Sequence, residues 1–112
     1  MIRFIVCALA VSALCLAAGC APLKPASPSM WYGNCITPPG PDPCNSDMNI
    51  CQQFENVITQ KYATSGACRT ACNQVYNHLY YQGYDMQDCG YMLDRGSDLC
   101  EQECLRQYPA PK

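Results

Sequence analysis

The residues of this 112-residue chain that are best suited to chemistry are cysteines, which form two matched pairs. Cys68 and Cys72 form one C-x3-C motif, and Cys100 and Cys104 form a second. Residues four apart lie on the same face of a helix, one turn apart. If two such helices run antiparallel, the first cysteine of one motif faces the last cysteine of the other. This geometry predicts the disulfides Cys68–Cys104 and Cys72–Cys100.

The same cysteines would be needed for metal binding or for redox catalysis. Structural zinc sites use reduced thiolates, usually with spacings closer to C-x2-C. Thiol-disulfide oxidoreductases carry C-x2-C within a β-α-β pattern, which this sequence lacks. We therefore expect structural disulfides, with no metal and no cofactor.

Tyrosines are the second group that could bind a ligand. Four of the eight gather where the second predicted helix ends, namely Tyr76, Tyr80, Tyr81 and Tyr84. One interpretation is that their rings replace missing aliphatic core and keep the hydroxyl groups at the surface. The other is an aromatic patch that stacks on a sugar ring or receives a partner protein. Because Tyr80 and Tyr81 project about 100° apart on a helix, at least one should face solvent.

His78 is the only histidine and the main candidate for catalysis. The run Trp31-Tyr32-Gly33-Asn34-Cys35 weakly resembles the calcium loop of secreted phospholipase A2 enzymes, whose helices are also cross-linked by disulfides. That family requires aspartate directly after its histidine, whereas Leu79 follows here, and the glycine-rich loop is missing. We carry no catalytic role onto His78. A hydrolase stays an alternative, which a pocket joining His78 to Asp85 or Asp88 would favour.

Apolar residues at helical spacing predict three helices. The first begins at the capping run Asn45-Ser46-Asp47 and ends near residues 64–66. The second carries the first C-x3-C motif and stops at Gly83. The third follows Ser97-Asp98, carries the second motif and ends before Pro109. A weaker short element is expected over residues 86–93.

Proline shapes the segment before these helices. It stands at every third position from Pro22 to Pro28, and the nine residues 21–29 therefore favour an extended tether of about 28 Å. Residues 31–45 are rich in proline and glycine and predict a loop without a regular element. The expected fold is a small, disulfide-rich all-α domain of about three helices. Two disulfides staple an antiparallel helical hairpin, and an irregular proline-rich arm precedes it.

The first residues predict export. After Arg3, residues 4–18 are uncharged and largely apolar. About 15 such residues suit a signal peptide and fall short of the about 20 needed to span a membrane. The run Leu16-Ala17-Ala18-Gly19-Cys20 then resembles the lipobox of bacterial lipoproteins, with Ala17 where the family usually has leucine. The resemblance implies cleavage before Cys20 and lipid on that cysteine. The alternative is an ordinary signal peptide that leaves Cys20 as a thiol.

The resemblance divides the chain into a signal peptide (residues 1–19), a lipidated tether (20–30) and a helical domain (31–112). Because Ala21 rather than Asp follows the lipidated cysteine, it also implies the outer membrane if the organism is Gram-negative. Of the 11 cysteines, two leave with the signal and one is lipidated, so eight remain. An even number in a short exported domain predicts four disulfides. Besides the two hairpin bonds, we expect Cys51–Cys89 and Cys35–Cys44.

The net charge and the family resemblance of the C-x3-C motifs limit which functions the sequence can support. The formal net charge is −2, and without a basic run the chain is not expected to bind nucleic acid. Twin C-x3-C pairs are similar to those of the mitochondrial small translocase chaperones and the plant hairpinin peptides. That similarity covers residues 68–104 and implies shared geometry, not shared function.

The hypothesis is a noncatalytic envelope lipoprotein whose stapled domain is a structural or partner-binding module. It would reach the membrane through lipid on Cys20 and bind an envelope protein whose identity is unknown. The alternatives are the phospholipase A2-like hydrolase and a glycan-binding module that uses the tyrosine-rich end of the second helix.

Overall fold

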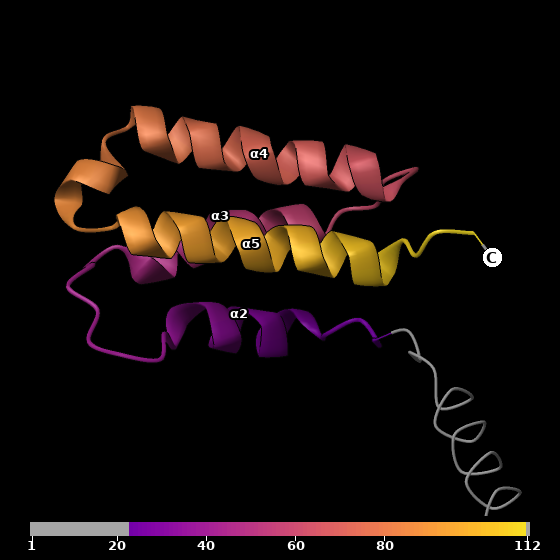
Figure 1. Cartoon of the computed structure of the whole chain (residues 1–112), viewed down its shortest axis with the longest axis horizontal. Coiled ribbons are helices and arrows are strands. Elements are labelled where there is room, and N and C mark those ends of the chain that lie inside the picture. Colours follow the sequence, from indigo (N-terminus) through magenta and orange to yellow (C-terminus); the bar gives the residue numbers. More distant parts are fainter. Residues whose placement is uncertain (1–22, 112) are drawn as a thin grey trace, which may run out of the picture.

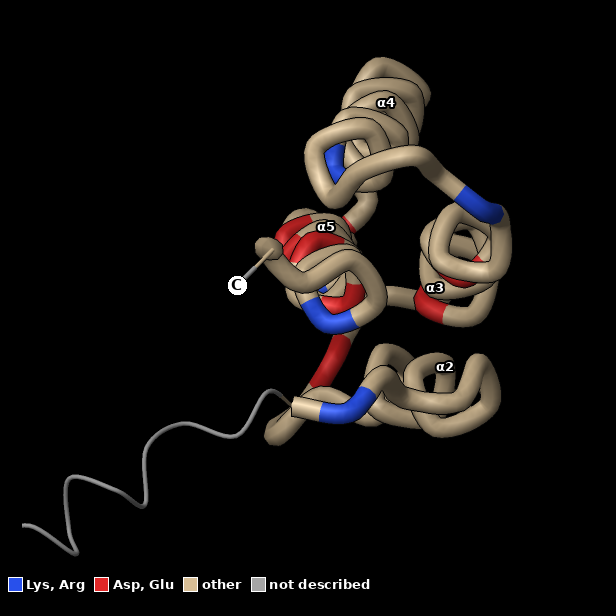
Figure 2. Tube along the Cα trace, turned by 90° about the vertical axis from the view of Figure 1, so that its right-hand side faces the viewer, with Lys and Arg blue, Asp and Glu red and all other residues tan. Residues whose placement is uncertain are grey.

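Four α-helices pack side by side in the computed structural model, which describes residues 23–111 (Figure 1). They are α2 (Pro28–Ile36), α3 (Asp47–Ile58), α4 (Ser65–Tyr81) and α5 (Gly90–Gln107), and the 3-10 helix η1 (Tyr84–Gln87) precedes α5. Helices α3 and α5 form the centre, and α4 and α2 cover opposite sides of them (Figure 2). The described residues contain no strand. The disulfide-rich all-α class expected from the sequence is confirmed, with four helices in place of three.

Successive helices run antiparallel, so the bundle has two distinct ends. At one, which we call the arm end, the Tyr108 hydroxyl accepts a hydrogen bond from the Tyr62 backbone N–H at 2.9 Å. The proline-rich arm enters and the chain terminates at this end (Figure 1). At the other, which we call the tyrosine end, α4 finishes at Tyr81 and η1 and the start of α5 follow.

Helix α3 buries the face that the sequence predicts, including Ile50, Phe54 and Val57. The predicted end near residues 64–66 was wrong, because the helix stops at Ile58. The Gln60 backbone N–H donates to the Val57 carbonyl and not to that of Asn56, which a longer helix would require, and the Thr59 hydroxyl donates to the Asn56 carbonyl in its place.

Helix α4 begins and ends as its capping residues require. The Thr64 hydroxyl accepts a hydrogen bond from the Ala67 N–H, which caps the first turn. Gly83 follows the last turn with φ 81°, a left-handed conformation that glycine adopts without strain. The predicted stop at Gly83 is therefore confirmed.

Helix α5 begins at Gly90, so the prediction that the third helix starts after Ser97-Asp98 was wrong. Its first two turns bury Met92 and Leu93. This burial stabilises helical structure upstream of Ser97-Asp98, which the sequence predicts as the N-cap and first turn. The weak element predicted over residues 86–93 is in fact divided between η1 and α5, with Asp88 at φ 59° between them.

Helix α2 was not predicted, since residues 31–45 were expected to lack regular structure. Pro28 stands in the first turn, where its missing N–H costs no hydrogen bond, and the Ser27 hydroxyl accepts from the Met30 N–H. The helix therefore begins inside the segment predicted as a tether. Trp31 is 2% exposed and its indole N–H donates to the Leu99 carbonyl at 3.0 Å, which fixes α2 against α5.

The core between these helices contains as many cysteines as other hydrophobic residues. All eight described cysteines are buried with Trp31, Ile50, Phe54, Val57, Ile58, Leu79, Met92 and Leu93. Such a core buries little apolar area for a chain of this length, so the disulfides must contribute part of the folding stability. Each described helix is too short or too polar to cross a membrane.

Candidate partner-binding surface

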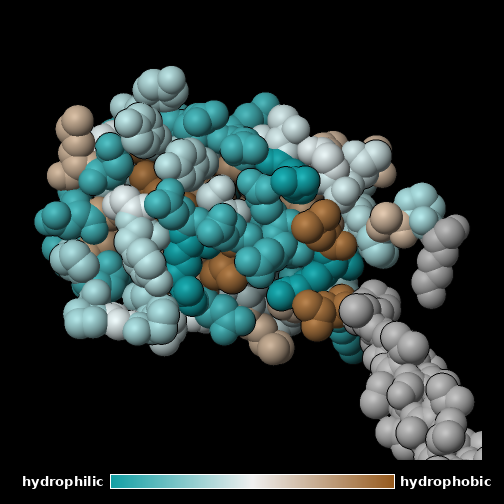
Figure 3. Space-filling model, in the orientation of Figure 1, coloured by the Kyte–Doolittle hydropathy of each residue, from teal (hydrophilic) through white to brown (hydrophobic). Residues whose placement is uncertain are grey.

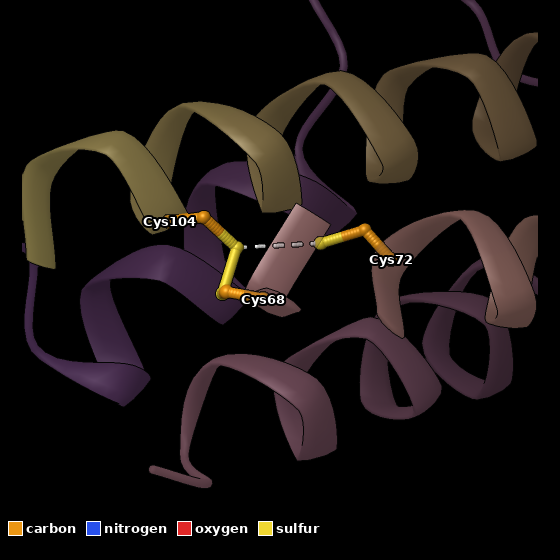
Figure 4. Close-up of side chains that lie close together, drawn as sticks. All are labelled: Cys68, Cys72 and Cys104. Atoms are coloured by element: carbon orange, nitrogen blue, oxygen red, sulfur yellow. Dashed lines mark hydrogen bonds between the residues drawn. A yellow bond between two sulfur atoms is a disulfide. The ribbon is translucent and has the colours of Figure 1, made fainter. Parts of the chain in front are cut away.

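The eight described cysteines form four disulfides. Cys68–Cys104 and Cys72–Cys100 join α4 to α5 as the C-x3-C spacing predicts. The two bonds lie next to each other, with the Sγ atoms of Cys72 and Cys104 3.6 Å apart (Figure 4). We interpret that dashed contact as packing between the two disulfides, because a disulfide sulfur carries no hydrogen to donate.

Metal binding at this cluster would require its reduction. The sulfurs of Cys68, Cys72 and Cys104 lie within 4.8 Å of one another, a spacing that could surround an ion. In the oxidised protein all three belong to disulfides and are fully buried. A disulfide sulfur offers no thiolate, which is the form that zinc binds.

The other two predicted pairings, Cys51–Cys89 and Cys35–Cys44, were wrong. The structure instead joins Cys35 to Cys51 and Cys44 to Cys89. The cause is the unpredicted helix α2, which packs along α3 and places Cys35 beside Cys51. The following loop then carries Cys44 to the residue that precedes α5.

The four predicted tyrosines gather at the tyrosine end, and two of them form its outer surface. Tyr81 is 86% exposed and Tyr80 47% exposed. The Tyr80 ring stacks on Tyr76 with centroids 6.3 Å apart, and meets Tyr81 edge-on at 6.0 Å. Three neighbouring rings thus form a continuous aromatic surface.

The other two tyrosines are tied to neighbouring elements. The Tyr76 hydroxyl donates to the Asp94 carboxylate at 3.1 Å, which links α4 to α5. Partial burial, followed by the hydrogen bond and charge of Asp94, raises the pKa of Tyr76 above its ordinary 10.0. The Tyr84 hydroxyl accepts from the Asn49 amide at 2.7 Å, which links η1 to α3. These bonds hold the aromatic surface in place.

Exposed methionines extend this end, and the sequence analysis missed them. Met86 in η1 is 88% exposed, and Met48 is exposed in the first turn of α3. The hydrogen bond between Asn49 and Tyr84 brings these two elements together. The sequence signal for such a residue is an apolar side chain that falls outside the helical spacing of the neighbouring buried residues.

His78 lies near the tyrosines on α4, where its ring nitrogen is 3.0 Å from the Gln82 side-chain nitrogen. The hollow nearest in sequence is lined by Asn73, Tyr76, Asp94, Ser97 and Asp98, so His78 does not contribute to it. Neither Asp85 nor Asp88 lines that hollow. We therefore assign no chemistry to His78.

A buried carboxylate fastens the proline-rich arm at the opposite end. Glu103 is fully buried, and one oxygen accepts the Ala26 backbone N–H at 3.0 Å and the Gln107 amide at 3.3 Å. Its other oxygen pairs with Arg106 at 3.4 Å. Because a buried charge must be compensated, these donors make Glu103 a fixed attachment point for the arm.

The proposed lipidation site, Cys20, lies outside the described residues. Comparisons with protein families, with curated proteins and with solved structures found no match.

Proposed function

We propose that the protein is a noncatalytic envelope lipoprotein whose stapled helical bundle holds a partner-binding surface away from the membrane. The observation that carries the proposal is that the two ends of the bundle differ. The arm that leads back to Cys20 enters at one end (Figure 1). The exposed side chains at the other end include Tyr80, Tyr81, Met48 and Met86, whereas the exposed Met30 lies in the first turn of α2, at the arm end. A lipid on Cys20 would thus leave the tyrosine end directed towards a partner.

The residue types at the tyrosine end suit protein binding. Tyrosine supplies a large contact area with few rotatable bonds, and exposed methionine adapts to irregular surfaces. Tyr80 packs between Tyr76 and Tyr81, so part of its side-chain freedom is already lost before binding. The Cys44–Cys89 bond, just before α5, holds the backbone of this end in the same way.

Export as a lipoprotein is supported by the lipobox resemblance and by the pairing of all eight described cysteines. Stable disulfides form in the periplasm or outside the cell, and cytosolic proteins seldom keep them. If the organism is Gram-negative, we propose the outer membrane as the destination.

Site-specific photo-crosslinking in intact cells tests the partner. A benzophenone amino acid at position 81 should give one discrete protein adduct, and Tyr80→Ala in the same chain should reduce its yield. The same probe at Gln60, exposed in the loop at the arm end, serves as the matched control. No adduct from position 81, or an identical adduct from position 60, would contradict the proposal.

Glycan binding is a second candidate, favoured by the hollow beside Tyr76. Asparagine, serine and two aspartates line it together with the tyrosine. Polar side chains beside an aromatic ring are able to hold a sugar by hydrogen bonds and stacking. Titration with cell-wall glycan fragments, followed by NMR, should shift the Asn73 and Ser97 amide signals saturably, and Asp94→Ala should abolish those shifts. A flat titration would exclude these glycans as ligands.

A further inference from the structure

An exposed apolar surface lies at the arm end, opposite the tyrosine end. Leu23 is 70% exposed and Leu105 52% exposed, and with Pro109 they line a shallow hollow whose rim includes Gln102 and Arg106. Figure 3 shows hydrophobic side chains at this end of the bundle, beside the point where the described chain begins. Isolated exposed leucines need no explanation, but leucines that share one hollow suggest a contact surface.

Chain length limits what can cover this hollow. Leu23 follows Cys20 by three residues, and an extended chain spans at most about 3.6 Å per residue. If Cys20 carries lipid, the Leu23 backbone lies within about 11 Å of the lipidated residue. We propose that the hollow formed by Leu23, Leu105 and Pro109 rests on the bilayer surface as a second, noncovalent membrane contact. This inference depends on the proposed lipidation of Cys20.

The attachment of the arm makes the contact hard to avoid. The sequence predicted a free tether of about 28 Å, but Glu103 holds the backbone of Ala26 and α2 begins at Pro28. Only residues 21–25 remain to separate the domain from the lipid, or about 16 Å in a polyproline conformation. The domain therefore lies against the membrane with its arm end facing it.

Charge favours the same orientation. Lys24 and Lys61 are exposed at the arm end. The acidic residues there include Glu101 and Glu103, which are paired with arginines. Lysine ammonium groups near a bilayer attract anionic headgroups, while their aliphatic stems cover apolar surface.

The opposite end carries the opposite charge. Asp47 starts α3, and Asp85 and Asp88 lie in and after η1, all at the tyrosine end. An anionic membrane repels such a surface. Electrostatics and chain length thus agree on which end faces the lipid.

Fluorescence quenching tests the contact. The lipidated protein is purified from membranes and reconstituted into phosphatidylethanolamine and phosphatidylglycerol vesicles whose acyl chains carry bromine. Leu105→Trp reports on the proposed contact and Tyr81→Trp is the matched control at the other end. The native Trp31 is buried, so the unsubstituted protein supplies the background to subtract. Mass spectrometry of each sample verifies the lipid on Cys20.

We expect brominated vesicles to quench most of the added emission from position 105 and little from position 81. Lys24→Glu should reduce the quenching at position 105 severalfold. Equal quenching at the two positions, or none at 105, overturns the membrane contact while leaving the anchor intact. A sample without lipid on Cys20 instead refutes the anchor, so the two failures are distinguishable.

Discussion

At the scale of single residues, one glycine records how closely two helices approach. A Cβ atom on Gly96 would lie 2.6 Å from Cδ2 of Phe54, much closer than carbon atoms can pack. Glycine costs a helix interior about 1 kcal/mol relative to alanine, so its presence in the middle of α5 needs a reason. The Phe54 ring against its backbone supplies that reason. A sequence reading could not find this contact, because it joins residues far apart in the chain.

Gly96→Ala should destabilise the protein by about 1–2 kcal/mol, since overpacking outweighs the gain in helix propensity. Gly33→Ala is the matched control in α2, because its added methyl would meet nothing within 4 Å. That control should stabilise the protein by about 0.5–1 kcal/mol. Urea unfolding of the oxidised proteins measures both changes. A stabilising Gly96→Ala would show that the helices are further apart than described.

The raised pKa of Tyr76 predicts a pH dependence. The unfolded chain loses this proton near pH 10.0 while the folded protein keeps it to higher pH. The stabilising contribution is therefore complete below pH 10 and is lost as pH rises through the folded pKa. Tyr76→Phe should flatten the fall in stability over about pH 9–11, leaving the part due to Tyr62, whose pKa is also raised. Unfolding midpoints across that range provide the measurement, and identical pH profiles would refute it.

At the scale of elements, what could be predicted depended on whether a pattern was local. The hairpin disulfides follow from helical spacing alone, so the sequence was sufficient for them. The pattern does not predict helix α2, because its prolines and glycines favour extended chain and loop, although Ser27-Pro28 is a usual way to begin a helix. The error then propagated to the pairing of Cys35 and Cys44, which depends on where α2 lies. Similarly, Ser97-Asp98 has the residue types of a helix start, but burial of Met92 and Leu93 makes α5 begin upstream of it, at Gly90.

The Cys44–Cys89 bond should act on one end of the bundle. It closes a 45-residue span, and its loss costs up to about 4 kcal/mol on chain-entropy grounds. In Cys44→Ala with Cys89→Ser, hydrogen exchange should quicken over residues 37–46 and 84–90. The α4–α5 hairpin should stay protected, because its two disulfides remain. Uniformly faster exchange would show that this bond supports the whole fold and not its tyrosine end.

At the scale of the whole molecule, the two ends of the bundle differ, and this difference separates the proposed anchor from the proposed binding surface. The sequence indicated a tether and a tyrosine cluster but not that they lie at opposite ends. That depends on the number of helices, because each antiparallel helix reverses the direction of the chain. With α2 included, the arm and the tyrosines lie at opposite ends.

Mass spectrometry of the native protein tests the proposed lipid anchor and the four disulfides. The protein from membranes should begin at Cys20 and carry lipid there. Reduction should add two hydrogens for each of the four disulfides. An unmodified Cys20 would remove the anchor, and free thiols at Cys68 or Cys72 would bring metal or redox chemistry back into consideration.

The disulfide pairing also determines what a protease can do to this protein. Cys35–Cys51 joins α2 to α3, two bonds join α4 to α5, and Cys44–Cys89 connects the two pairs. Any single backbone cut between Cys35 and Cys104 therefore leaves one covalently continuous molecule. A tryptic cut after the exposed Lys61 should give one band in a nonreducing gel and two after reduction. The tyrosine end would stay attached to the arm that leads back to Cys20 even after the chain had been nicked.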